Sequence, residues 1–267
     1  MNESEARRIM ANGLGRAQLE FATSVCAPLY WIVREEDGKL SVNNGTAFFL
    51  DTGSATFAVT ADHVLRGLAQ DQQNRDVISV QMGHDLVLEF DTEHEIIDRD
   101  SDIDIATFRI AKQDVDRLGK TILTGIQSNW PPSAPQQGKG IYFSGFPGQE
   151  RMWLSPSEIS FGAAPGGGVA DSVSERTIST LFDRSRWIDV MGKGFPPENY
   201  DFGGISGGPM LSAIERRGLR SWALAGVIVQ GPSVSSSVSE SISGLEIVQA
   251  RRAHFIGPKG EIDRTRW

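Results

Sequence analysis

The most chemically suggestive part of the chain is the short segment around one serine, Ser206. It lies in Gly204–Pro209, which reads Gly-Ile-Ser-Gly-Gly-Pro. Glycine permits backbone conformations that other residues avoid, so this segment can expose a hydroxyl on a tight turn. A glycine-rich turn without chemistry would have the same composition. A serine becomes a nucleophile only when a neighbouring base takes its proton and an acid orients that base.

The histidines supply the candidate base. The chain has four of them, His63, His84, His94 and His254. His63 follows an apolar, β-branched run that ends in Thr-Ala-Asp-His and leads into a short helical stretch, Val64 to Ala69. This order predicts that the imidazole lies at the mouth of a strand.

The candidate acid lies in the segment from Ser101 to Ile110. Acidic and apolar residues alternate there, which is the period of a half-buried strand. Of the two acids in the alternating part, Asp102 and Asp104, we favour Asp104, because Ile-Ala follows it. The three candidates are therefore His63, Asp104 and Ser206, in that chain order.

These motifs carry a resemblance to a known family. Thr60–His63, Asp104–Ala106 and Gly204–Pro209 together resemble the chymotrypsin-type (trypsin-like) serine proteases, whose triad order differs from that of subtilisins and α/β-hydrolases. Gly45–Leu50 is similar to the Gly-x-Gly-Phe strand ahead of the family's histidine. Gly145–Pro147 resembles a Gly-aromatic-Pro segment in the second barrel of bacterial members.

The resemblance implies a serine endopeptidase that works through an acyl-enzyme and needs no cofactor or metal. His63 would act as general base and then general acid, while Asp104 would hold the ring in the useful tautomer. The backbone N–H groups of Gly204 and Ser206 would form the oxyanion hole. Because the base must be neutral, we expect activity to fall as the pH drops through roughly 6 to 7.

The fold implied is all-β, with two six-stranded antiparallel β-barrels and short N-terminal and C-terminal helices. The 29 glycines and 12 prolines separate many short apolar runs, as is typical of such folds. Helical patterns occur at Glu3 to Arg16 and at Ile247 to Phe255. The expected units are an N-terminal helical extension at 1–24, a first barrel with His63 and Asp104 at 25–128, a linker and second barrel with Ser206 at 129–248, and a C-terminal helix or tail at 249–267.

The resemblance implies a primary specificity pocket around Tyr200, Asp201, Gln230 and Gly231. A tyrosine at its base would favour small or modestly apolar side chains, whereas an inward Asp201 would favour Lys or Arg, and we lean to the former. The serine-rich stretch Pro232–Ser241 is expected to form a flexible rim. A strand near residues 244–246 would complete the wall.

Two positions depart from the family pattern. Ile205 stands where trypsin-type zymogens have an aspartate that receives a newly cut N-terminus, so that activation is not available here. Val229 stands where a small polar residue should support the acid. Two alternatives therefore remain open: a catalytically inactive protease-fold binding or regulatory module, and an esterase-type acyl hydrolase with the same triad. One further hypothesis is that a regulatory protein partner or the substrate orders the Gly204 turn.

Composition excludes several other classes. A net charge of −8 argues against nucleic-acid binding, and no run reaches the roughly 18 apolar residues that span a bilayer. Cys26 is the only cysteine, so no intramolecular disulfide can form, and the start lacks the pattern of a signal peptide. The acidic run at 91–104 fails the EF-hand pattern. We expect a cytoplasmic bacterial protein that contacts a protein or peptide substrate and neither membrane nor nucleic acid.

Overall fold

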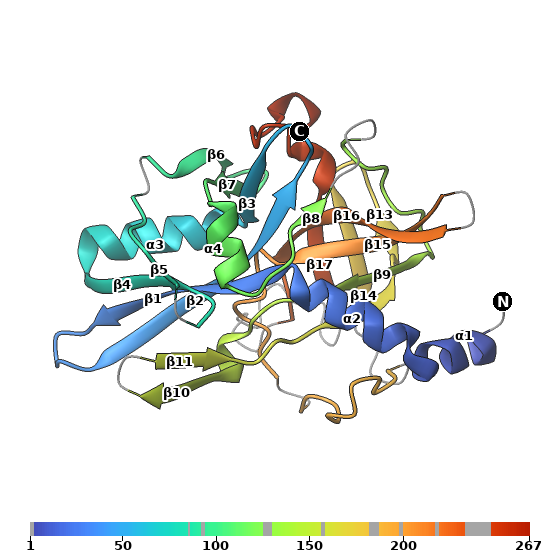
Figure 1. The fold of residues 1–267 in the computed structure, drawn as a ribbon, viewed down its shortest axis with the longest axis horizontal. Helices are drawn as coiled ribbons and strands as arrows, with labels where there is room; N and C mark the ends of the chain where they lie inside the picture. Colours follow the sequence, from blue (N-terminus) through green and yellow to red (C-terminus); the bar gives the residue numbers. More distant parts are fainter. Residues whose placement is uncertain are drawn as a thin grey trace, which may run out of the picture.

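The computed structural model describes residues 3–84, 86–91, 94–124, 130–155, 158–181, 187–197, 200–216, 219–232 and 247–267. These residues form two β-sheets, and the N-terminal helix at Gly15–Ser24 contacts strands of both (Figure 1). No helix in these ranges has the length and apolar character that crossing a membrane requires.

The first sheet holds eight strands, all antiparallel except for the pairing of β8 with β2. Its order is β5-β4-β1-β2-β3-β7-β6. The strands are β1 (Cys26–Arg34), β2 (Leu40–Asp51), β3 (Thr56–Thr60), β4 (Asp76–Met82), β5 (Leu86–Leu88), β6 (Ile96–Asp100), β7 (Ile105–Phe108) and β8 (Leu123–Thr124). Helix α3 (Asp62–Asn74) follows β3 directly, and α4 (Lys112–Arg117) follows β7.

The second sheet holds seven antiparallel strands in the order β12-β9-β15-β16-β17-β14-β13. They are β9 (Gly140–Phe143), β12 (Gly166–Val169), β13 (Ser172–Val173), β14 (Thr177–Leu181), β15 (Pro209–Arg216), β16 (Leu219–Gln230) and β17 (Ile247–Arg252). A separate hairpin, β10 (Arg151–Ser155) and β11 (Glu158–Phe161), follows a short 3-10 turn, η3 (Gly148–Glu150).

The expected all-β fold class is confirmed, because the described strands form two mainly antiparallel sheets. The strand count differs from two sets of six, since the described sheets have eight and seven strands. The N-terminal helical pattern is confirmed as α1 (Glu3–Ile9) and α2 (Gly15–Ser24), which are separated by a kink in η1 (Met10–Leu14), where Asn12 and Gly13 have non-helical backbone angles.

The helix expected at Ile247 to Phe255 is wrong. Residues Ile247–Arg252 form β17, because they pair with β14 on one side and β16 on the other, and Val248 and Ala250 are buried between them. Helical structure after β17 is limited to the 3-10 turns η5 (Ala253–Phe255) and η6 (Arg264–Arg266). Sheet pairing between distant segments has overridden a local helical pattern.

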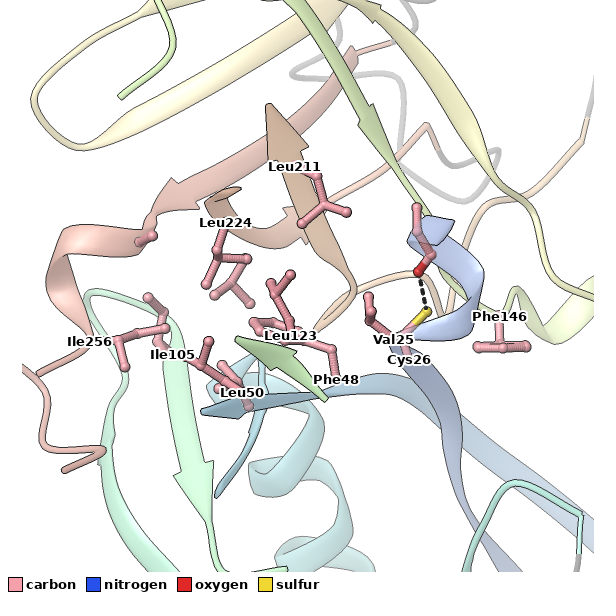
Figure 2. Packing of buried hydrophobic residues seen from close by; sticks show 14 of the residues in the cluster. Val25, Cys26, Phe48, Leu50, Ile105, Leu123, Phe146, Leu211, Leu224 and Ile256 are labelled. Carbon is pink, nitrogen blue, oxygen red and sulfur yellow. Dashed lines mark hydrogen bonds between the residues drawn. The ribbon is translucent and has the colours of Figure 1, made fainter. Parts of the chain in front are cut away.

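The largest apolar cluster lies between the two sheets. Phe48 and Leu50 of β2 face Leu211 of β15 and Leu224 of β16 across it (Figure 2). Cys26 lies at its edge, where burial raises the pKa of the thiol to about 12 and Sγ donates to Ala22 O. This close packing fixes the position of one sheet relative to the other, so side chains that lie where the two sheets meet are held in defined positions.

A second cluster lies between the first sheet and its helices. It joins alternate side chains of β1, such as Leu29 and Trp31, to Val64, Leu65 and Leu68 of α3. Strand β1 is therefore buried on both faces, which explains its almost uninterrupted apolar sequence. The packing also fixes the start of α3, where His63 lies.

Candidate active site

His63 and Asp104 contact each other directly. The His63 Nδ1 atom lies 2.8 Å from Asp104 Oδ2 and 3.1 Å from Oδ1. The backbone N–H of His63, in the first turn of α3, donates to the same carboxylate at 2.9 Å. An ionised carboxylate can only accept, so Nδ1 carries the hydrogen and a neutral ring presents a free lone pair at Nε2. The Asp104 carboxylate thus binds the first turn of α3 and also fixes which ring nitrogen of His63 carries the hydrogen.

Asp104 lies on a tight turn rather than inside the strand predicted for residues 101–110. Strand β7 begins only at Ile105, and Asp104 has a φ of 60°, in the left-handed region. Its N–H donates to Asp100 O at 2.8 Å, and the Asp100 carboxylate accepts from the N–H groups of Asp102 and Ile103. These bonds close the acid turn, residues 100–104, and aim Asp104 at α3.

The backbone of the serine turn, residues 203–208, is almost completely paired. The N–H groups of residues 203, 205, 207 and 208 donate, in that order, to Asp201 Oδ1, Phe202 O, Ile228 O and Ile205 O. The carbonyl oxygens of residues 203, 204, 205 and 206 accept, in the same order, from Gly148 N, Thr46 Oγ1, Gly208 N and Thr46 N. Among the described residues, the N–H groups of Gly204 and Ser206 donate to no protein atom. Two amides are therefore available on a turn whose other peptide groups are fixed.

Two glycines let the serine turn approach its neighbours so closely. Gly204 has a φ of 105°, and a Cβ there would collide with Asn44 Nδ2 and lie 2.8 Å from Phe146 O. Gly207 has a φ of 89°, and a Cβ there would collide with Thr46 O and Thr60 Oγ1. The added atom would also lie 3.0 Å from Ala61 N, two residues before His63. The serine turn of the second sheet thus packs on the backbone that leads into the histidine.

The Ser206 hydroxyl is not bonded to the histidine in this conformation. Its Oγ donates to Val229 O at 3.4 Å, and among the described residues no hydrogen bond joins it to the His63 ring. The His63 side chain is 38% exposed, whereas Asp104 is 18% exposed. The structure therefore brings the candidate base and the candidate acid into contact and places the serine turn beside them. Catalytic hydrogen bonds are often long or unaligned before substrate binds.

Thr46 is a site residue that the sequence did not single out. This fully buried residue donates its N–H to Ser206 O and its Oγ1 to Gly204 O, both at 2.9 Å. The same hydroxyl accepts from Phe146 N at 2.9 Å. The sequence could have indicated Thr46, because it is a polar residue inside the apolar run 45–50. Polar groups that are buried in this way are usually hydrogen-bonded.

Ile205 anchors the serine turn through packing instead of charge. Its side chain is 1% exposed and lies against Phe202 in an apolar cluster. Gly145 and Gly231 flank it so closely that a Cβ on either would lie within 2.7 Å of Ile205 atoms. The turn is thus held in the isolated chain without the buried ion pair of trypsin-type zymogens.

The four residues predicted for the specificity pocket lie in different surroundings. Tyr200 is buried and donates to Glu150 Oε1 at 2.7 Å, and burial together with that hydrogen bond raises the pKa of its phenol. Asp201 accepts from Gly203 N at 2.8 Å, so its carboxylate caps the serine turn. Gly231 packs on Ile205 and Phe202, whereas Gln230 is exposed. The predicted rim at 233–241 and strand at 244–246 lie outside the described residues.

A buried ion pair lies next to the histidine. Asp62 is fully buried, and its Oδ1 lies 2.7 Å from Arg99 Nε on β6. Arg66 Nη1, one turn along α3, lies 3.5 Å from Oδ2. Neither contact has hydrogen-bond geometry within the described part of the chain, so the carboxylate is paired by charge. This pair ties the helix that carries His63 to the strand that precedes the acid turn.

Comparison with known proteins gives structural neighbours only. No family model matches the chain, and no curated protein matches it. The serine protease domain of the Sesbania mosaic virus polyprotein is 14% identical, with a TM-score of 0.40, over 85% of this chain and 89% of that one. A structure on the coupled folding and binding of the Sesbania mosaic virus VPg protein is 12% identical, with a TM-score of 0.40, over 87% and 94%. Deg5 is 15% identical, with a TM-score of 0.44, over 86% and 87%.

Proposed function

We propose that this chain is a serine endopeptidase that hydrolyses peptide bonds through His63, Asp104 and Ser206. The observation that carries the proposal is the backbone of the serine turn. Every N–H from residue 203 to 208 is donated except those of Gly204 and Ser206, among the described residues. Two fixed, unpaired donors beside a hydroxyl are the arrangement that stabilises an oxyanion, and the paired His63 and Asp104 supply the base.

In the proposed acylation step, the Ser206 hydroxyl turns from Val229 O to His63 Nε2. Oγ attacks the carbonyl carbon while its proton passes to Nε2. The carbonyl π electrons move to the oxygen, which accepts hydrogen bonds from the Gly204 and Ser206 amides. When the C–N bond breaks, Nε2 returns the proton to the leaving amine and the acyl group remains on Oγ.

In the proposed deacylation step, a water molecule replaces the amine. His63 Nε2 takes a proton from this water, whose oxygen attacks the ester carbon. The Oγ–C bond then breaks, and the same proton returns to Ser206 Oγ. Asp104 stays ionised throughout and stabilises the imidazolium through Nδ1.

The proposed enzyme needs no proteolytic activation. The support for this is Ile205, whose buried side chain already holds the serine turn, and Thr46, which already binds two of its carbonyls. The hypothesis that a regulatory protein partner or the substrate orders the serine turn, which contains Gly204, is therefore not part of the proposal. We also propose that Tyr200 and Gly231 limit the primary pocket to small or modestly apolar side chains.

A second candidate function is a binding module that keeps the protease scaffold without turnover. The observation that favours it is the Ser206 hydroxyl, which bonds to Val229 O and, among the contacts of the described residues, makes no hydrogen bond to His63. Under this alternative the hydroxyl would stay in that position when a peptide binds, and the unpaired amides would hold a carbonyl without reacting with it.

Cleavage of a peptide library and of denatured protein separates these functions from each other and from an esterase. Wild-type protein should cleave peptide bonds, and Ser206→Ala should lower turnover by roughly 10⁴ to 10⁶. Hydrolysis of small esters without peptide cleavage would instead support an acyl hydrolase. Peptide binding to both forms without cleavage by either would support the binding module and contradict the proposal.

A further inference from the structure

Arg251 of the second sheet reaches across to the acid turn of the first. Its Nε donates to Ile103 O at 2.9 Å, and its Nη2 lies 3.4 Å from Asp102 O. These two carbonyls immediately precede Asp104. The guanidinium also stacks on the ring of Trp267, with its carbon 4.8 Å from the ring centre, which limits its movement.

The acid turn has no other support from the second sheet among the described contacts. Within the described part of the chain, the hydrogen bonds to the Asp104 carboxylate all come from His63, through its N–H and its ring. Val229 offers no polar side chain to that carboxylate. From the C-terminal segment, Arg264 Nε lies 2.8 Å from Asp100 Oδ2 and steadies the start of the turn. The far end, just before Asp104, is held by Arg251.

Charge gives a second link between the two residues. Burial lowers the pKa of Arg251, and the negative charge of Asp104 acts in the opposite direction. Arg251 therefore places a positive charge within electrostatic reach of Asp104. The other charged groups around this site are Asp62 and Arg66 on α3, Arg99 and Asp100 on β6, Asp102 on the turn, Arg176 beside Arg251, and Arg264 after β17.

We propose that Arg251 is a positioning residue, which takes over the support that a polar side chain at position 229 would have given to Asp104. It binds the Asp102 and Ile103 carbonyls and thereby keeps the Asp104 carboxylate on His63. This inference rests on the proposed protease function, because it assigns Arg251 to the same acid and base.

Two substitutions separate the hydrogen bonds from the charge. Arg251→Gln removes both the charge and the guanidinium, and a misplaced acid should lower kcat/KM by on the order of 10- to 100-fold. A displaced Asp104 also weakens the hydrogen bond that it accepts from His63 Nδ1–H, and the downfield proton NMR signal of that hydrogen reports this bond directly. Arg251→Lys keeps the charge but not the planar set of donors, so it should lower kcat/KM and weaken the same signal.

The neighbouring Arg252 provides the matched control. It lies on the same strand and donates to Ser174 O and Glu175 O, away from the acid turn. Arg252→Gln removes the same charge and a comparable set of hydrogen bonds, so a purely structural loss would appear in both variants. Thermal unfolding of all variants shows whether each is folded at the assay temperature.

The proton NMR signal makes the test independent of turnover. In the Ser206→Ala background, the downfield signal of His63 Nδ1–H should shift upfield or broaden in Arg251→Gln and stay unchanged in Arg252→Gln. If wild-type protein cleaves nothing but this change occurs, the protease function fails and the role of Arg251 stands. An unchanged signal in Arg251→Gln, or equal rate losses in Arg251→Gln and Arg252→Gln, would overturn the proposal.

Discussion

The two sides of the candidate site are built in different ways. On the first sheet, His63 and Asp104 are held by contacts of their own functional groups, at 2.8 Å. On the second sheet, Ser206 is held through its backbone, while its hydroxyl makes one long contact of 3.4 Å. The proposed base and acid are thus fixed in the free chain, whereas the proposed nucleophile sits on a fixed turn and its hydroxyl can still rotate. Activity should therefore respond most strongly to changes of side-chain chemistry on the first side and to changes of backbone shape on the second.

Asp104→Asn should give the largest effect on the first side. The asparagine keeps the shape but can donate to the ring, which favours the wrong tautomer, so kcat/KM should fall by about 10⁴-fold with little loss of stability. Asp102→Asn is the matched control, because Asp102 is exposed and lies two residues earlier on the same turn. Steady-state cleavage assays check this prediction. Equal losses in both variants would remove Asp104 from its proposed role.

Gly204→Ala should have the next largest effect and tests the backbone side. Its φ of 105° and the contact with Phe146 O leave no room for a Cβ, so the turn must shift and the two free amides must move. Loss of an oxyanion donor costs about 10²- to 10³-fold in kcat. Gly203→Ala is the control. A Cβ at Gly203 would have one atom closer than 3.4 Å, which is Asp201 Oδ1 at 3.1 Å. A fully active Gly204→Ala variant would contradict the proposed oxyanion hole.

Thr46→Val should have a smaller effect on the same side. It keeps the shape and the backbone contact with Ser206 O but leaves Gly204 O and Phe146 N without their partner. We expect a loss of about 1–3 kcal/mol in the free energy of unfolding, the cost of unpaired buried groups. Denaturant titration measures it, and Thr46→Ser, which keeps the hydroxyl, should lose less. If Val and Ser behave alike, the hydroxyl does not hold the turn.

The smallest effect concerns pH and separates stability from catalysis. Burial, with Arg252 and Arg266 nearby, lowers the pKa of His254 to about 4. An unfolded histidine titrates near 6.5, so between about pH 6.5 and 4 only the unfolded chain takes up the proton. Stability should therefore fall as the pH drops through this window. Chemical denaturation at pH 7 and pH 5 checks it.

His254→Gln should reduce this pH dependence of stability without moving the acidic limb of the rate profile, which we assign to His63. His84→Gln, at an exposed position, is the control and should change neither. A limb that moves with His254→Gln would mean that activity is lost in acid through unfolding, which would weaken the assignment of the base.

The parts of the site that the sequence reveals are those that depend on residue type. A hydroxyl, an imidazole and a carboxylate in a family-like order were enough to propose Ser206, His63 and Asp104. The contacts made by Thr46 and Arg251 could not be predicted, because they join residues 158 and 148 positions apart in the chain. The all-β class was readable from short apolar runs, whereas β17 was mistaken for a helix because its partners are distant strands.

Intact-mass spectrometry after exposure to a fluorophosphonate tests the central claim most directly. If His63 activates Ser206 beside the free amides, wild-type protein should gain one phosphonyl group on Ser206 with loss of fluoride. Ser206→Ala should gain none, and His63→Ala should react far more slowly. An unlabelled wild-type protein, or a His63→Ala variant that labels as fast as wild type, would contradict the account.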